Sequence, residues 1–428
     1  MKPANPAMPC AFETRGVVLT PADLTLKDWP ERAARAGLTT IALHLRPSVV
    51  EKFVDSPEGK EFLAKCARLG LNVEYELHAL GELLPRNLFA KEPDLFRMNE
   101  VGVRTPDVNL SVHSVRALEI ASSNALRIAQ KLRPTIHRYY FRGDDSTKGW
   151  CHCPKCRQYS ASEQALIYED CLVAALRKVD SQATLAHLAY ATTVAVPVKV
   201  KPAPGIFLEF APISHEYDRP FAQQTNPRFG DTLQALRANL KVFPVETAQV
   251  LEYWLDVSRF SRWRLPHQKL PWRPEVMAAD AQTYAQLGIR NVTTFAVYID
   301  ANYFAQYGEP TAIQEYGDIL RATPLPTPSK TYTIARVPKP AIQLDGRLDE
   351  PEWKQAVAET GSSLTCEEAK APPTVFRALI GEEYLYFAFE VHDETPLIAE
   401  SFPDKLTVAK EDRVELFFAP DNSLAKYL

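Results

Sequence analysis

The strongest constraint on the fold is a repeated alternation of two hydrophobic patterns along the chain. Short runs rich in β-branched and aromatic residues alternate with longer runs whose apolar residues recur at helical spacing. Several helical runs end in glycine directly before the next short run, as helices do at their C-terminal caps. The short runs, which we predict to be strands, are residues 15–20, 39–45, 72–80, 137–144, 184–190, 205–212, 248–256 and 291–300.

Strand and helix alternating eight times predicts an α/β fold, a closed (β/α)8 TIM-type barrel. We place this barrel at residues 15–322, after an N-terminal extension over residues 1–14. A doubly wound open sheet is the alternative architecture with the same alternation. The pattern Gly-x-Gly-x-x-Gly does not follow the first predicted strand, which disfavours the dinucleotide-binding form of that open sheet.

The pattern changes after a proline-rich linker at residues 323–330. Prolines there keep the chain extended and end the last predicted helix of the barrel. Beyond the linker, apolar and polar residues alternate with period two, as in strands that bury one face. We therefore predict an antiparallel β-sandwich over residues 331–428, and we expect it to be partial because the sequence ends soon after its last strand-like run.

Composition excludes several classes of protein. The 428 residues, 46% of them hydrophobic, are enough for a large core and a second domain. The formal net charge is −4 and no basic block occurs, so we expect no nucleic-acid partner. We also expect no membrane span, because no apolar run approaches the roughly 18 residues that a spanning helix needs. The first residues lack the apolar centre of a signal peptide.

Acidic and aromatic residues gather at the ends of the predicted strands, where barrels of this type place catalytic side chains. Sugar sites favour that mixture, because pyranose rings stack on aromatic faces while their hydroxyls bind charged groups. No cofactor is required for such a site. The residues that we expect to bind substrate are Glu76, His78, Arg142, Trp150, Tyr190, Glu209, Tyr253, Trp254, Asp256, Tyr298 and Asp300.

The catalytic candidates are Asp144, Asp145 and Glu252, and two arrangements of them would cleave a glycosidic bond. In the first, Asp144 or Asp145 faces Glu252 across the mouth, and a separation of roughly 5–5.5 Å would imply retention of configuration. In the second, one aspartate protonates the leaving oxygen while its neighbour orients the substrate's own 2-acetamido group as the nucleophile. Any single acid could instead cap a helix.

Three cysteines, Cys151, Cys153 and Cys156, follow these aspartates within six positions. The Cys-x-x-Cys pair could bring two thiolates onto a structural zinc, with Cys151 as a third ligand. The alternative is a stiff loop in which the three cysteines pack or partly form disulfides. Candidates for a fourth zinc ligand are His152, His137 and Cys171.

The stretches "YELHALGELLPRNLFAKEPDLFRMNEVGVRTPD" and "WCHCPKCRQYSASEQAL" resemble a bacterial glycoside-hydrolase-like family long classed as a domain of unknown function. Part of that family is assigned as endo-β-N-acetylglucosaminidases that act on N-glycans. The resemblance covers residues 15–325 and implies a glycosidase barrel. The "RGDD" of this chain departs from the family's common form, in which a single acid in "ND" precedes glycine.

The tail resembles the family 9 carbohydrate-binding modules. The stretches that carry the resemblance are "IQLDGRLDEPEWKQA", "YLYFAFEVHDE" and "EDRVELFFAP". It implies a carbohydrate-binding domain in which Trp353 is a core residue and not a sugar platform. Such a domain would favour a secreted or periplasmic location, although no signal peptide is visible.

Together these features predict a glycoside hydrolase that acts on an oligosaccharide or polysaccharide, N-acetylhexosamine glycans included. A non-catalytic glycan-binding protein on a barrel scaffold is the alternative, because a fold does not determine a function. A metal-dependent hydrolase that uses the cysteine loop is a third interpretation.

Overall fold

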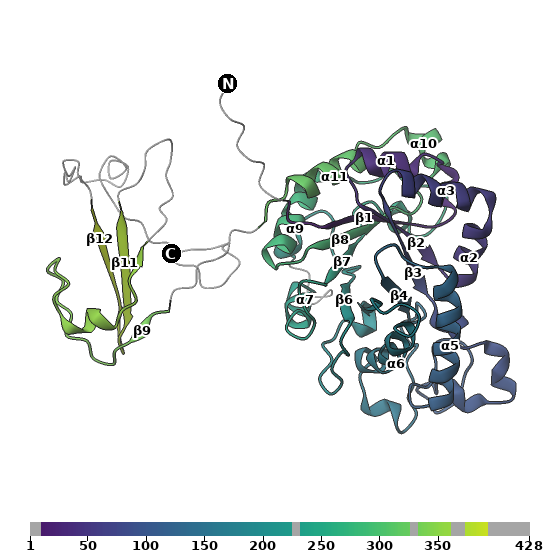
Figure 1. Cartoon of the computed structure of the whole chain (residues 1–428), viewed down its shortest axis with the longest axis horizontal. Coiled ribbons are helices and arrows are strands. Elements are labelled where there is room, and N and C mark those ends of the chain that lie inside the picture. The colour runs from purple at the N-terminus through teal and green to yellow at the C-terminus, as the bar shows by residue number, and fades with distance from the viewer. Residues whose placement is uncertain (1–9, 225–231, 326–332, 361–372, 393–428) are drawn as a thin grey trace. The chain divides into compact units, whose positions relative to one another are not determined.

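A computed structural model describes residues 10–224, 232–325, 333–360 and 373–392 (Figure 1). The chain divides into two compact units, Met1–Pro326 and Thr327–Leu428. Among the described residues, no helix combines the length and apolar character that crossing a bilayer requires.

The first unit is a closed barrel of eight parallel strands that pair in chain order, and β1 also pairs with β8. Gly16 on β1 is in register with Thr40 on one side and with Thr293 on the other, so the sheet has no free edge. The predicted (β/α)8 barrel is confirmed, and the open sheet is wrong. The strands are β1 (Thr14–Leu19), β2 (Thr40–Leu45), β3 (Asn72–His78), β4 (Arg138–Arg142), β5 (Thr184–Ala189), β6 (Ile206–Phe210), β7 (Gln249–Glu252) and β8 (Asn291–Phe295).

Helices surround these strands (Figure 1). Several of them begin at a side-chain cap. For example, Ser160 accepts a hydrogen bond from the backbone of Glu163, whose carboxylate accepts one from the backbone of Ser160 in return. The α-helices are α1 (Trp29–Arg35), α2 (Pro47–Asp55), α3 (Pro57–Arg68), α4 (Leu80–Leu83), α5 (Val115–Lys131), α6 (Ala161–Leu176), α7 (Thr232–Asn239), α8 (Val257–Phe260), α9 (Pro274–Gln286), α10 (Ala301–Tyr307) and α11 (Ala312–Ala322). Short 3-10 helices in this unit are η1 (Asp23–Thr25), η2 (Arg86–Ala90), η3 (Pro93–Leu95), η4 (Cys156–Gln158), η5 (Ala191–Thr193) and η6 (Phe221–Gln223).

The barrel interior is polar at its centre. The Tyr140 hydroxyl on β4 lies 2.9 Å from Glu74 Oε2 and 3.0 Å from Gln249 Oε1, which joins three strands across the lumen. Side chains alternate between lumen and helix layer along each strand. On β7, the side chain of Gln249 points into the lumen, so every second residue counted from it also points inward. The residues between them face the helices.

The two ends of the barrel unit lie together. The backbone amide of Ala11 donates to the carbonyl of Thr323 at 2.9 Å, and Cys10 forms a β-bridge with Pro324. Residues 10–14 of the predicted extension thus pack beside the start of the predicted linker. Residues 1–9 and 326–332 lie outside the described residues.

The second unit contains a small sheet in which β11 (Thr374–Ile380) pairs antiparallel with β12 (Leu385–Val391). Trp353 on η8 (Pro351–Gln355) is buried against Leu379 and Ala388, which confirms its predicted core position. The described residues form one sheet of the predicted sandwich, and the strand-like run at 413–420 lies outside them. The remaining strands are β9 (Ala335–Arg336), parallel to β11, and β10 (Glu359–Thr360), antiparallel to it.

Candidate active site

A cavity of about 270 Å³ lies at the C-terminal ends of the barrel strands, where barrel enzymes place their chemistry. A smaller cavity of about 30 Å³ adjoins it and shares part of its wall. The residues that line these cavities can therefore be compared with the residues predicted to bind substrate. The predicted residues that line the larger cavity are His78, Arg142, Asp145, Tyr190, Tyr253 and Asp256.

Asp145 is an exposed carboxylate on the loop after β4, and it lines both cavities. The hydroxyl of Tyr190, which follows β5, lies near this carboxylate. Burial, with the charge of Asp145 adding to it, raises the pKa of Tyr190 to about 12. Tyr190 therefore stays a neutral hydrogen-bond donor at any physiological pH.

Asp144 has different contacts, although it is adjacent in sequence. Its carboxylate accepts hydrogen bonds from the amides of Gly81, at 2.8 Å, and Asn109, at 2.7 Å. The guanidinium of Arg86 adds a third contact at 3.0 Å. Asp144 thus ties the loop after β4 to the segment after β3, and it lines only the smaller cavity.

Glu252 does not face the aspartates across the mouth, which corrects the first predicted arrangement. It lies on the outward face of β7, and its side chain is 0% exposed. Its carboxylate accepts hydrogen bonds from the hydroxyls of Tyr217, at 2.6 Å, and Tyr284 on α9. The physical reason is the alternation on β7, in which Leu251 and Tyr253 take the cavity side.

Trp254 is likewise an outward residue, so its predicted role in binding substrate is not supported. Its indole Nε1 donates to Asp280 at 3.1 Å. Asp280 and Glu252 also flank His215, with their oxygens 3.7 and 3.5 Å from the imidazole nitrogens. Burial opposes protonation of His215, but Glu252 and Asp280 outweigh it and raise its pKa. Burial raises the pKa of Asp280 to about 7.

Glu76 and Glu209 are also placed differently from the prediction. Both are 0% exposed inside the lumen and pair with Arg142, at 2.6 Å for Glu76 Oε2 and 2.8 Å for Glu209 Oε2. The two carboxylates neutralise Arg142 from inside the lumen, and the Arg142 side chain reaches the cavity wall. They therefore orient a candidate binding residue and do not themselves line the cavity.

The contacts of four predicted residues, Trp150, Asp256, Tyr298 and Asp300, complete the comparison. Trp150 lines the smaller cavity, and its Nε1 donates to Thr192 at 3.1 Å. Asp300 caps α10 by accepting from the amide of Tyr303, and Tyr298 packs edge-on against His267. Neither Asp300 nor Tyr298 lines either of the two cavities. Asp256 caps α8 through the amide of Arg259, although it also lines the larger cavity.

Two histidines lie together at the mouth: His78 was predicted as a binding residue, and His44 was missed. His44 and His78 have ring centroids 5.3 Å apart. Each Nδ1 lies within hydrogen-bonding distance of a backbone carbonyl, at 2.8 Å for Glu76 and 2.6 Å for Gly143. Because a carbonyl only accepts, Nδ1 carries the proton, and Nε2 is the acceptor nitrogen of the neutral ring. Burial lowers the pKa of both rings, and the charge of Arg142 adds to it.

The residues that hold Asp144 were missed as well. Arg86 lies on η2, and Asn109 lies in an irregular segment far from any predicted strand end. Asn109 has a positive φ of 48°, a conformation that asparagine adopts more readily than most residues. The sequence offers little reason to select Arg86 and Asn109, because their partner Asp144 lies more than thirty residues away in sequence.

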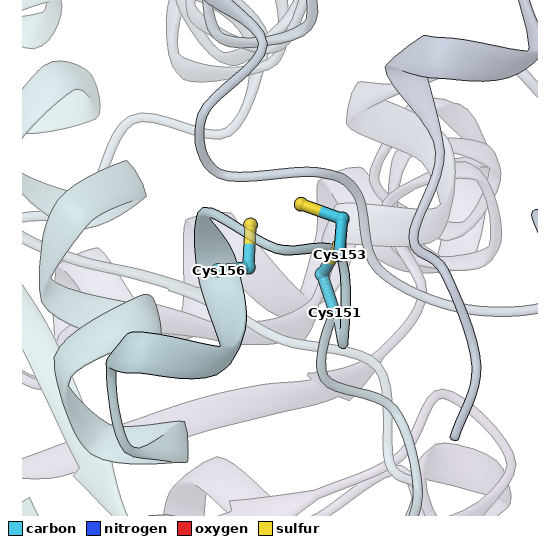
Figure 2. A group of neighbouring side chains, drawn as sticks. All are labelled: Cys151, Cys153 and Cys156. Atoms are coloured by element: carbon cyan, nitrogen blue, oxygen red, sulfur yellow. The ribbon is translucent and has the colours of Figure 1, made fainter. Parts of the chain in front are cut away.

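The three cysteines of the loop lie together (Figure 2). Their sulfur atoms are within 4.8 Å of one another, and all three are buried free thiols. Gln164 on α6 holds the loop closed, because its side chain bonds the amide of Cys151 at 3.0 Å and the carbonyl of Cys156 at 3.2 Å. A hydrogen bond from Cys156 and the backbone amides of Met98 and Cys153 lower the pKa of Cys151.

The fold and this site define a (β/α)8 barrel protein with an acidic and aromatic mouth. Residues 59–316, more than half of the chain, match the family described as "Domain of unknown function (DUF4838)". The chain belongs to this family, which agrees with the resemblance drawn from its sequence. A search of curated proteins found no match.

Several solved structures are similar to this chain. A glycoside hydrolase family 5 enzyme from Prevotella bryantii B14 matches at 13% identity, over 69% of this chain and 86% of that chain, with a TM-score of 0.43. The catalytic domain of β-amylase from Paenibacillus polymyxa matches at 10% identity, over 74% and 100%, with a TM-score of 0.47. The GH20 modules of the pneumococcal exo-β-D-N-acetylglucosaminidase StrH match at 11% identity, over 74% and 84%, with a TM-score of 0.38.

Proposed function

We propose that this protein is a glycoside hydrolase in which Asp145 is the general acid. The observation that carries the proposal is the position of Asp145: an exposed carboxylate on the wall of a cavity at the catalytic end of a barrel. Tyr190, a neutral donor near it, can hold it in place. The cavity also offers a cation, Arg142, and aromatic surfaces such as Tyr253 for a sugar ring.

We infer that the nucleophile belongs to the substrate. Asp145 and Asp256 are the carboxylates among the described residues that line the larger cavity, and Asp256 Oδ1 already accepts from Ser258 and Arg259. A 2-acetamido group can attack its own anomeric carbon, as substrate-assisted glycosidases do. Its N–H needs an acceptor, and Nε2 of His78 offers one beside Asp145. The substrate class would then be N-acetylhexosamine glycosides.

The test compares Asp145→Asn with Asp144→Asn and Glu252→Gln on a panel of N-glycans and aryl N-acetylglucosaminides. We expect Asp145→Asn to lower kcat by about 10²–10⁴-fold on natural glycans, the usual contribution of a general acid. The loss should be smaller on aryl glycosides, because their leaving groups need less protonation. Glu252→Gln should affect stability more than kcat. Full activity of Asp145→Asn on natural glycans would refute the assignment.

A non-catalytic glycan-binding protein is the second candidate, and one observation favours it. The predicted carboxylate pair does not form, because Glu252 faces the helix layer. This candidate requires glycan binding without sugar release after long incubation, with product analysis by NMR. Release of a sugar with defined anomeric configuration would eliminate it.

A further inference from the structure

The loop after β4 contains three ligand atoms that are suited to one metal ion. The side chains of Cys151, Cys153 and Cys156 lie together, and their sulfurs are all within 4.8 Å of one another (Figure 2). In a tetrahedral zinc site with Zn–S distances of about 2.3 Å, sulfurs lie about 3.8 Å apart. The separations in this loop are therefore at most about 1 Å longer than those of a zinc-bound set.

The Ser111 hydroxyl lies beside two of the three sulfurs and is a candidate for the fourth ligand. Its Oγ is 3.9 Å from the sulfur of Cys151 and 3.9 Å from that of Cys156. An oxygen ligand of zinc would lie about 3.5 Å from each sulfur. The predicted fourth ligands are not in the group: His152 is exposed, and His137 is bonded to Asp180. Cys171 lies on α6, outside the group of ligand atoms.

The surroundings suit a negatively charged metal–thiolate group. Three thiolates with one Zn²⁺ carry a net charge of −1. The amide of Met98 donates to Cys151 Sγ at 3.3 Å, and Arg104 Nη1 lies 3.8 Å from the same sulfur. Donors of this kind stabilise metal-bound ligands from outside the coordination sphere. Gln164 fixes the loop independently, so the ligands are placed before any ion binds.

We propose that Cys151, Cys153 and Cys156 bind one structural zinc ion, with Ser111 or a water at the fourth position. The ion would join two segments, because Ser111 and Met98 follow β3 while the cysteines follow β4. The same two segments hold Asp144 and present Asp145. The inference does not depend on the proposed hydrolase activity, since the site is complete without a substrate.

The test measures zinc directly in the full-length chain, purified under reducing conditions without a metal-affinity step. Elemental analysis should find stoichiometric zinc in the wild type and in Cys171→Ser, a matched control whose half-buried thiol lies on α6. Cys153→Ser and Cys156→Ser should bind zinc at least about tenfold more weakly, as loss of a ligand or its support does. Cobalt substitution should give thiolate-to-metal absorption in the wild type and lose it in Cys153→Ser.

Stability provides a second measurement that does not require the cysteine variants to fold. A chelator should lower the Tm of the wild type, and added zinc should restore it. Ser111→Ala keeps all three thiols, so it should retain zinc with reduced affinity. Wild-type protein without zinc, with no Tm change on zinc addition, would overturn the proposal. Titration showing that two of the three thiols are oxidised to a disulfide would do the same.

Discussion

Asp144 and Asp145 show how adjacent residues of one type come to serve different purposes. At the end of a strand, consecutive side chains leave the backbone in opposite directions. Asp144 thus meets Gly81, Arg86 and Asn109, while Asp145 meets the cavity and Tyr190. The sequence predicts that an acid stands at this strand end, but not which of the two it is. That choice depends on partners contributed by another segment.

Asp23 provides a residue-level prediction about pH. It is buried on η1, where its carboxylate accepts from the Thr20 amide at 2.7 Å and from the Tyr298 amide at 2.8 Å. Burial raises its pKa from 3.8 to about 6, although those hydrogen bonds oppose the shift. The folded state therefore binds more protons than the unfolded state between these values, and stability falls as pH rises through that window. The expected loss is about 2–2.5 kcal/mol between pH 4 and 7.

Asp23→Asn should abolish this part of the pH dependence of the unfolding free energy, measured with denaturant at pH 4.5, 5.5 and 7. Asp28→Asn is the control, because Arg32 lowers the pKa of Asp28. Its contribution changes only below its unfolded pKa of 3.8, outside the measured range. An Asp23→Asn variant with an unchanged pH slope would contradict the expectation.

At the scale of elements, hydrophobic pattern predicted each barrel strand but not the direction in which its side chains face. The hydrophobic run at 248–256 predicts one long strand, whereas β7 ends at Glu252. The hydrophobic pattern of this run does not distinguish the face toward the lumen from the face toward the helices. Both faces carry apolar and polar residues: Gln249 lies in the lumen and Glu252 in the helix layer. Polar residues on both faces remove the contrast that normally identifies the buried side. Glu252 and Trp254 were misplaced for this reason.

Helix packing gives a prediction at the same scale. A Cβ atom added to Gly317 on α11 would lie 1.9 Å from the carbonyl oxygen of Ala36, which follows α1. Gly317→Ala should therefore lower the unfolding free energy by about 1–3 kcal/mol, the usual cost of overpacking. Higher helix propensity would offset only up to about 1 kcal/mol of that cost. Denaturant unfolding measures the difference.

Asp318→Ala is the matched control for Gly317→Ala. It lies on the exposed face of the same helix, and its ion pair with Arg321 is at the surface. We expect its unfolding free energy to stay within about 0.5 kcal/mol of the wild type. If Gly317→Ala were as stable as Asp318→Ala, α1 and α11 would not be in close contact.

For the whole molecule, eight repeats of strand and helix were sufficient to predict a closed barrel, because few other folds satisfy that pattern. The candidate site was less predictable. Strand ends converge at the mouth of any such barrel, so six of the predicted binding and catalytic residues line the larger cavity: His78, Arg142, Asp145, Tyr190, Tyr253 and Asp256. His44 also lies at a strand end and could have been included. Arg86 and Asn109 act through loops, whose paths no local pattern specifies.

The division into two units predicts that the barrel is independent of the rest of the chain. Each unit has its own core, one centred on the barrel and one on Trp353. A chain ending at residue 326 should therefore keep the Tm of the barrel transition within about 2–4 °C, the shift that about 1 kcal/mol produces in a large domain. Differential scanning calorimetry measures it.

Turnover of a soluble glycan should also survive in the shortened chain, because every cavity-lining residue precedes residue 326. Retention on an insoluble glycan should fall if the second unit binds carbohydrate, as its resemblance to family 9 modules implies. A barrel that aggregates or melts far below the full-length chain would show that the two units stabilise each other.

The contacts of Asn109 have a consequence for engineering and for evolution. Its side chain accepts from the amide of Asp144 at 2.8 Å and donates to the carbonyl of Gly149 at 2.9 Å. Loops of a (β/α)8 barrel are usually exchanged one at a time, since each follows a separate strand. Here the conformation of the loop after β4 depends on hydrogen bonds from the segment after β3. A transplant of the acidic loop into another barrel would have to carry both segments, and natural variants should gain or lose them as a single module.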